Sequence, residues 1–309
     1  MLPSPSFKNG FARYKGHSKH PKLWDGLVGA WLPSLGVQGQ NLFDQSGFRN
    51  DGVLTNMTND DWVNSENGYV LAYGTNKYVQ LGQNLFENLD QGSIVIQFRV
   101  DDFSTIQEIY SHSASAADHF LRLFVFTDGT VGVNHSSTIS PIHNDAVTTG
   151  NSVTVGSWNH FVLTSNGSQW EMYLNGKKEA LSPLVGSNTG DWFSVLPSGT
   201  HDDRIGRLES VSVDAFFDGQ IGSFSVYNRP LFLQEIAKLY QDPHAAFELR
   251  RRTLGLSTSS VMKGITKGFD ASSKGFVELG AARGLTRGIT ELDAIKGITK
   301  GIRTRLGHS

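Results

Sequence analysis

The sequence predicts an all-β protein built as an antiparallel β-sandwich. Short strand-like runs rich in β-branched and aromatic residues, such as 92–100 and 120–126, are separated by turn-forming Gly, Asn and Asp. Residues 231–243 alone have a convincing helical periodicity, which Pro243 ends. Many short strands followed by one late helix are what two packed antiparallel sheets require.

Two local features sharpen this prediction. Asn175 and Gly176 lie between strand-like runs and predict a tight hairpin, because both residue types tolerate the positive φ angles of primed turns. Trp31 and Trp158 fall in apolar strand settings, so we expect both indoles to fill core space.

The charges divide the chain into an acidic body and a basic end. Residues 250–309 hold 12 Lys and Arg against four acidic residues, so the first 249 hold 15 basic and 25 acidic residues, although the whole chain has a net charge of only −2. We expect three parts: an extended N-terminal arm (1–22), a sandwich domain (23–249) and a Gly-rich basic C-terminal tail (250–309).

Several classes of protein are excluded by composition. The chain has no cysteine, which rules out disulfides and thiolate sites. No run of 18 apolar residues is present, so no membrane span is expected, and the first residues lack the apolar stretch of a secretion signal.

An ordered set of motifs resembles a known family. GLVGAW (26–31), DQSGFRNDGVL (44–54), YVQLG (78–82), RIGR (204–207) and QEIAKLY (234–240), with four further pieces between them, resemble the laminin-G-like branch of the concanavalin A-like lectin/glucanase jelly rolls. The resemblance covers residues 24–243. It implies a jelly roll whose first strand pairs near the last, and glycan binding or protein contact as the activity.

The body lacks the residues of a glucanase. Retaining hydrolysis needs an acid and a nucleophile about 5–5.5 Å apart, which glucanases of this superfamily supply from an E-x-D-x-E type cluster. Glu291 and Asp293 form the one E-x-D in the sequence, and they lie in the tail. We therefore expect no enzyme.

The resemblance also implies places to look for ligands. Laminin-G-like modules often bind calcium, for which Asp44 and Asp218 are the candidate residues; the family's usual acidic pair is replaced here by Gly222 and Ser223. No other cofactor is expected. For glycan stacking the candidate platforms are Trp62, Trp170 and Trp192, which have polar neighbours; the alternative is that each is a half-buried aromatic at the sandwich edge.

The tail repeats a basic residue, a glycine and a large apolar residue. These residues form the predicted assembly anchor: Lys263, Gly264, Ile265, Gly268, Phe269, Phe276, Gly284, Leu285, Gly288, Ile289, Gly297, Ile298, Gly301 and Ile302. Each Gly costs a helix about 0.5–1 kcal/mol relative to Ala, so we expect the tail to take its order from a partner. Its cations are spread singly and it has two aromatic residues, which disfavours nucleic acid as a partner and favours a protein lattice or identical subunits.

Together these features predict a non-enzymatic virion structural protein of a bacteriophage, either a capsid decoration or a head or tail appendage, assembled into the virion in the host cytoplasm. The expected partners are other virion proteins such as the major capsid protein, further copies of the chain in a homo-oligomer, and a host or surface glycan. The alternatives are a tail-fibre or receptor-binding lectin and a glycan hydrolase of the same fold.

Overall fold

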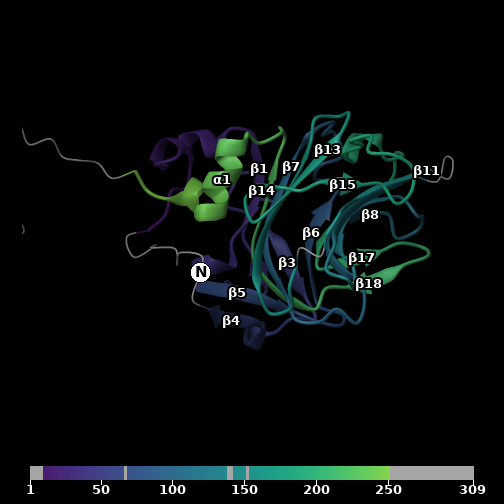
Figure 1. Cartoon of the computed structure of the whole chain (residues 1–309). Helices are drawn as coiled ribbons and strands as arrows, with labels where there is room; N and C mark the ends of the chain where they lie inside the picture. The colour runs from purple at the N-terminus through teal and green to yellow at the C-terminus, as the bar shows by residue number, and fades with distance from the viewer. Residues whose placement is uncertain (1–9, 66–67, 138–141, 151–152, 251–309) are drawn as a thin grey trace, which may run out of the picture. The chain divides into compact units, whose positions relative to one another are not determined.

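A computed structural model of the chain describes residues 10–65, 68–137, 142–150 and 153–250. These residues form a sandwich of two antiparallel sheets (Figure 1), which confirms the predicted fold class.

The first sheet, called here the back sheet, has eight strands. In spatial order they are β14 (Lys177–Lys178), β13 (Trp170–Leu174), β12 (Trp158–Ser165), β7 (Gly92–Val100), β19 (Gly219–Tyr227), β5 (Gly68–Tyr73) and β4 (Trp62–Ser65), with β1 (Leu27–Trp31) also paired to β19. The pairing of β1 with β19 confirms that the first long strand of the sandwich lies beside the last.

The second sheet, called here the front sheet, has nine strands. In spatial order they are β15 (Leu181–Ser182), β11 (Ile142–Thr148), β10 (Val131–Ser137), β9 (Phe120–Val125), β8 (Gln107–Ser113), β16 (Asp202–Ile205), β6 (Tyr78–Gln83), β3 (Gly52–Thr55) and β2 (Asn41–Leu42). A separate hairpin of β17 (Arg207–Glu209) and β18 (Asp214–Phe216) lies against β8.

The predicted strands and turn agree closely with the structure. The strand-like run 92–100 is β7, and the run predicted at 120–126 is β9. Asn175 and Gly176 have φ angles of 51° and 77° and form the tight turn between β13 and β14. Positive φ at both positions is what a primed turn needs, so the hairpin prediction is confirmed.

The main core lies between the two sheets. It is rich in aromatic side chains, among them Phe98, Phe161 and Phe224, and the predicted Trp31 is fully buried in it. Trp158, also predicted to fill the core, is only half-buried at the start of β12.

A second apolar cluster covers the outer side of the back sheet. The helix α1 (Leu233–Gln241) buries Ile236 and Leu239 there, as its periodicity predicted. Short 3₁₀ turns complete the structure; they are η2 (Lys15–His17), η3 (Pro21–Trp24), η4 (Pro33–Leu35), η5 (Asn59–Asp61), η6 (Phe193–Val195) and η7 (Ala245–Phe247). Of these, η3 and η7 contribute to this second cluster, so the back sheet has apolar neighbours on both sides.

The N-terminal segment differs from the prediction of an extended arm. Residues 10–22 lie against the end of the described chain: the Ala12 N–H donates to the Phe247 carbonyl, the Lys19 N–H donates to the Glu248 carbonyl, and Ser18 pairs with Leu249. Ala12 is fully buried. The arm prediction is therefore wrong for residues 10–22, because these residues find backbone and apolar partners on their own domain.

Candidate functional site

The three tryptophans predicted as glycan platforms are buried. Trp62 is 5% exposed, Trp170 1% and Trp192 0%. The indole nitrogens of Trp62 and Trp170 donate to the carbonyls of Gly39 and Asp191. For Trp62 in β4 and Trp170 in β13, successive strand residues point to opposite faces, so a polar neighbour says nothing about the tryptophan's own face. Trp192 precedes η6 and is buried in the main core. A ring without exposed surface cannot stack on a sugar, so this prediction is wrong.

Asp44 acts as a loop cap. Its carboxylate accepts four hydrogen bonds of 2.8–3.1 Å, from the N–H groups of Ala30, Ser46 and Asn50 and from the Ser46 hydroxyl. These bonds close the 44–50 loop and tie it to β1. A cation at Asp44 would have to displace donors that already use both oxygens.

Asp218 is exposed beside two other carboxylates. Partial burial and the charges of Asp101 and Asp102 raise the pKa of Asp218 above its usual range. Within the ranges that the structure describes, no group of three or more His, Asp or Glu side chains is arranged to hold a metal ion. Calcium binding stays a prediction at this position.

The outer face of the front sheet carries a group of polar side chains that was not predicted from the sequence. Along β16, Ile205 belongs to the core, whereas Arg204 and Asp202 alternate onto the outer face. Register places Arg204 opposite Ser111 of β8 and Gln80 of β6. Three adjacent strands thus contribute polar groups to one surface.

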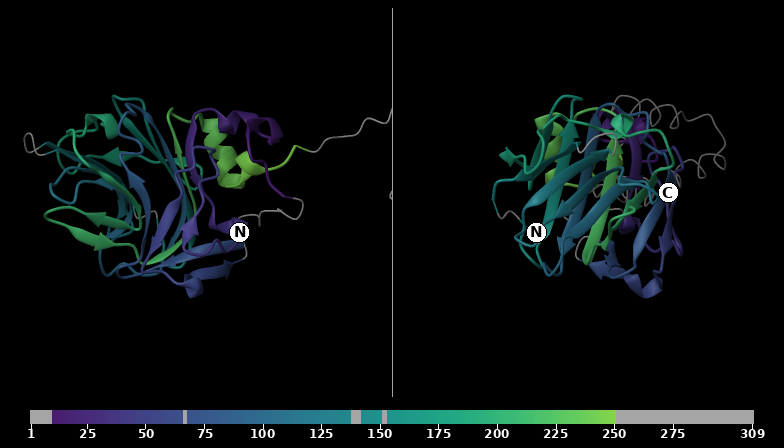
Figure 2. Two further views of the ribbon diagram at one scale, coloured as in Figure 1. Left: turned by 180° about the vertical axis from the view of Figure 1, so that it is seen from behind. Right: turned by 90° about the vertical axis from the view of Figure 1, so that its right-hand side faces the viewer.

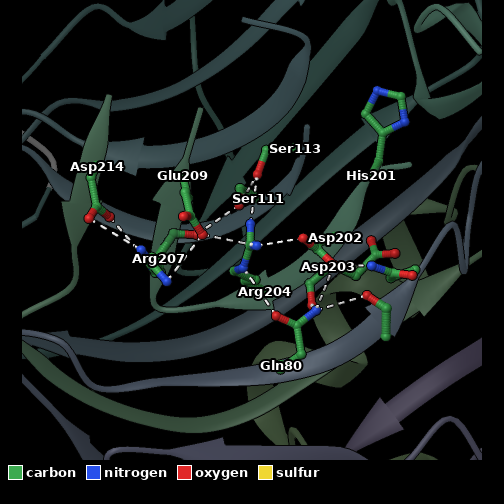
Figure 3. A network of polar contacts seen from close by, with 12 residues as sticks. Gln80, Ser111, Ser113, His201, Asp202, Asp203, Arg204, Arg207, Glu209 and Asp214 are labelled. Atoms are coloured by element: carbon green, nitrogen blue, oxygen red, sulfur yellow. Dashed lines mark hydrogen bonds and ion pairs between the residues drawn. The ribbon is translucent and has the colours of Figure 1, made fainter. Parts of the chain in front are cut away.

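Arg204 is the centre of this network (Figure 3). Its Nε donates to Gln80 Oε1 at 3.1 Å and its Nη1 to Ser113 Oγ at 3.3 Å. Its Nη2 lies 2.5 Å from Asp202 Oδ2 and 3.1 Å from Glu209 Oε2, so one guanidinium bridges two carboxylates. The Arg204 residue is only 4% exposed, which makes these ion pairs stronger than pairs on an open surface.

Arg207 of β17 extends this network along the outer face of the front sheet. Its guanidinium donates to both oxygens of Asp214 at 2.9 and 3.2 Å and lies 3.2 Å from Glu209. Burial acts to lower the pKa of Arg207, but the hydrogen bond to Asp214 and the nearby acidic charges outweigh it and raise the pKa. The same guanidinium lies 4.9 Å from the ring centre of Tyr78 and 5.2 Å from that of Phe216.

A glycine explains how Arg207 reaches this position. Gly206 has a φ of 86°, and a Cβ there would lie 2.4 Å from the Tyr73 ring. The chain therefore leaves β16 in a direction that only glycine permits without strain. The Arg207 carbonyl then accepts a hydrogen bond of 2.7 Å from the Ser111 hydroxyl, which holds β17 above β8.

A second polar group lies farther along the same face. Arg122 of β9 donates to Glu108 of β8 at 2.5 Å, and its guanidinium lies 4.5 Å from the Phe124 ring centre and 5.5 Å from that of Phe120. Burial raises the pKa of Glu108, and the Arg122 charge opposes the rise. Glu108 is fully buried, so the ion pair between Glu108 and Arg122 stabilises the outer face from inside the sheet.

This surface was only partly visible in the sequence. RIGR at 204–207 is one of the motifs of the family resemblance, but the charged residues of DDRIGRLE follow no regular alternation and Gly206 interrupts the run. Three charged residues in succession do not show which of them point outward, and nothing local pairs Arg204 with Gln80 or Arg207 with Asp214. The predicted anchor residues, 263–302, lie outside the described residues. No helix among the described residues is long and apolar enough to span a bilayer.

Solved structures with similar folds include several carbohydrate-related domains. Domain 4 of AbnA, an extracellular arabinanase from Geobacillus stearothermophilus in complex with arabinotriose, is 16% identical with a TM-score of 0.53, covering 70% of this chain and 98% of that one. The Ruminococcus gnavus sialidase module CBM40 bound to sialyllactose is 21% identical with a TM-score of 0.44, covering 50% and 84%. Trypanosoma rangeli sialidase is 16% identical with a TM-score of 0.49, covering 71% and 33%.

Among curated proteins no sequence match was found. The family model described as the concanavalin A-like lectin/glucanases superfamily matches residues 73–237, which is more than half of the chain. This range runs from β5 to α1 and includes most strands of both sheets. The chain belongs to the concanavalin A-like lectin/glucanase superfamily.

Proposed function

We propose that this domain binds a glycan, without catalysis, on the outer face of its front sheet. The observation that carries the proposal is the partly exposed row formed by Asp202, Glu209, Arg207 and Asp214 beside the rings of Tyr78 and Phe216. Sugars combine hydroxyl groups with apolar C–H faces, and a row of charged acceptors and donors next to aromatic rings matches both. The fold supports this reading, since an arabinanase domain of similar fold has been solved with arabinotriose.

The row is fixed before any ligand arrives. Each guanidinium is held by at least two acidic partners, and the carboxylates are held in turn. A ligand would therefore meet side chains that lose little conformational entropy on binding. Asp214 and Glu209 keep 52% and 31% of their side-chain surface exposed, which leaves lone pairs for hydroxyl donors.

The arrangement favours binding over hydrolysis. Asp202 and Glu209 are both engaged by the same Arg204 nitrogen, and a carboxylate paired with a permanent cation is a hydrogen-bond acceptor and a poor proton donor. General acid catalysis of glycoside cleavage needs a carboxyl group that holds its proton.

A glycan array tests this proposal. The full chain is applied to immobilised neutral and acidic oligosaccharides that include arabinotriose, and the Kd of each hit is measured by calorimetry. Asp214→Ala and Tyr78→Ala should each weaken binding by about tenfold or more, the equivalent of about 1.4 kcal/mol. Phe232→Ala is the matched control, because Phe232 is also an exposed ring near an arginine but lies at α1, on the other side of the sandwich. An equal loss in the control, or no hit at all, would refute the proposal.

We further propose that the domain is a component of a virion, held there by its tail and displaying the front sheet outward. The Arg250 N–H donates to the His17 carbonyl of η2, and the layer that holds the N-terminal 3₁₀ turns and α1 lies on the side of the sandwich away from the β17–β18 hairpin (Figure 1 and Figure 2). A chain attached through residues beyond 250 would leave the Arg207 surface clear of the attachment point. The partners in this proposal are the major capsid protein or another virion protein, with further copies of the chain.

Truncation after Arg250 tests the attachment. The shortened protein should fold and keep its glycan binding but should no longer co-purify with particles. Incorporation at the level of the full chain would contradict the anchoring role while leaving the glycan proposal intact.

A further inference from the structure

The front-sheet row exposes its carboxylates more than its arginines. The side chain of Asp214 keeps 52% of its surface exposed and that of Glu209 31%, whereas Arg207 keeps 15% and Arg204 only 5%. A ligand that approaches this face therefore meets carboxylate oxygens before guanidinium nitrogens. Ionised carboxylates only accept hydrogen bonds, so the ligand has to supply the donors.

The guanidinium of Arg207 is already engaged on all three nitrogens. Its Nε and Nη2 donate to the two oxygens of Asp214, and its Nη1 lies 3.2 Å from Glu209 Oε2. The rings of Tyr78 and Phe216 lie 4.9 and 5.2 Å from the guanidinium. A guanidinium binds an anion most strongly when it offers two parallel N–H groups, and Arg207 has already given that pair to Asp214.

Arg204 is engaged in the same way (Figure 3). Its Nε donates to Gln80 and its Nη1 to Ser113. Its Nη2 lies between the carboxylates of Asp202 and Glu209. Neither arginine therefore has two neighbouring nitrogens without a protein partner, and an acidic ligand would have to displace one of the existing contacts.

The charges of these side chains do not cancel. Two guanidiniums face three carboxylates, those of Asp202, Glu209 and Asp214, which leaves one negative charge in excess. The excess lies on the exposed side, because Asp214 and Glu209 are the most exposed members of the group. Charges near a protein surface interact more strongly than charges in bulk water, so a negative group on a ligand would be repelled here.

We propose that the front-sheet row selects glycans by charge: it accepts neutral or amino-bearing oligosaccharides and rejects those whose bound residues carry a carboxylate, sulfate or phosphate. This inference rests on the proposed glycan function and adds the class of ligand to it. Hydroxyl and ammonium groups donate to Asp214 and Glu209. Rejection of acidic sugars comes from repulsion by the same two carboxylates, since specificity depends on what a surface disfavours as well as on what it binds.

A matched pair of ligands isolates the charge. Each neutral oligosaccharide that the glycan array identifies is oxidised to a carboxylate at one primary hydroxyl at a time, and part of each product is converted to its methyl ester. Calorimetry with the full chain at pH 7 gives the Kd of both forms. The carboxylates should bind more weakly than their esters, the most affected by about tenfold or more. Raising NaCl from about 20 to about 500 mM should reduce the difference, because salt screens exposed charges.

Two variants locate the source of the selection. Asp214→Asn removes one negative charge and keeps a side chain of the same size, so it should reduce the Kd ratio of carboxylate to ester by about threefold or more. Asp25→Asn is the matched control, because Asp25 is 47% exposed, is also paired with a cation, Lys15, and lies between η3 and β1. It should leave the ratio unchanged. An equal change in both variants would assign the preference to the net charge of the protein and overturn the role of the row.

The failure of this inference differs from the failure of the proposed function. Carboxylates that bind as tightly as their esters, or array hits confined to acidic glycans, would overturn the charge selection while glycan binding stands. An array without any hit would overturn both. Neutral hits whose oxidised forms lose affinity, with the loss reduced by Asp214→Asn alone, support it.

Discussion

The outer faces of the two sheets differ in what covers them. The back sheet is covered by α1, η3 and η7, and the contact is apolar, with Ile236, Leu239 and Phe247 buried. The front sheet instead carries arginines and carboxylates under the short hairpin of β17 and β18. The back face therefore buries apolar surface, and the front face keeps charged groups at the surface, where we propose that a glycan binds.

The largest expected effect comes from removing the charge at the centre of the front face. Arg204→Ala leaves the buried ends of Asp202 and Glu209 without their cation, which should cost about 3–5 kcal/mol of unfolding free energy. Urea denaturation measures it. Arg99→Ala removes a more exposed arginine from its pair with Asp101 and should cost about 1 kcal/mol or less. Similar costs for both variants would show that the Arg204 network is not buried in solution.

A comparable change on the back face acts through packing. Ile236→Ala removes a fully buried side chain between α1 and the back sheet and should cost about 3 kcal/mol. Glycan binding should not change, since the helix lies on the other side of the sandwich. A variant that loses glycan affinity in proportion to its stability would show that the two faces are coupled.

Acid should weaken the back face through a buried histidine. Burial lowers the pKa of His160 to about 3, and its ring lies 6.0 Å from that of Tyr240 on α1. The unfolded chain protonates this group near pH 6.5 while the folded chain keeps it neutral, so its stability contribution is complete above pH 6.5 and declines as the pH falls toward 3. The slope is about 1.4 kcal/mol per pH unit at most for one histidine.

His160→Phe is the matched variant for this prediction. Melting temperatures measured from pH 7.5 to 4.5 should fall less steeply in the variant than in the parent chain. Parallel curves would mean that His160 is hydrated in solution and that the back face is less dry than the structure shows.

The smallest expected change in stability belongs to the exposed end of the front row. Asp214 keeps 52% of its side-chain surface exposed, so Asp214→Ala should alter the unfolding free energy by about 0.5 kcal/mol or less. The same variant is expected to lose glycan affinity. A marked loss of stability would assign the row to holding the hairpin and would remove the reason to regard it as a binding surface.

The sequence was most informative where structure is local. The runs rich in β-branched and aromatic residues predicted β7 and β9, and Asn175–Gly176 predicted its turn, because these depend on neighbouring residues. The tryptophan predictions failed because burial of Trp192 depends on which sheet covers it, and no local pattern records that. Asp203 and His112 are 91 positions apart, and their contact exists only because β16 pairs with β8. Nothing in the one-dimensional pattern could have paired them.

The short antiparallel bridge between Ser18 and Leu249 has a consequence for how this domain can be combined with others. A Cβ on Gly10 would lie 3.9 Å from the Leu249 side chain, so the described chain enters and leaves its body at nearly one point. Domains with adjacent entry and exit points can be inserted into a loop of a host protein without stretching it. We therefore expect residues 10–250 to tolerate insertion between two loop residues of a host protein, which would keep its own connectivity.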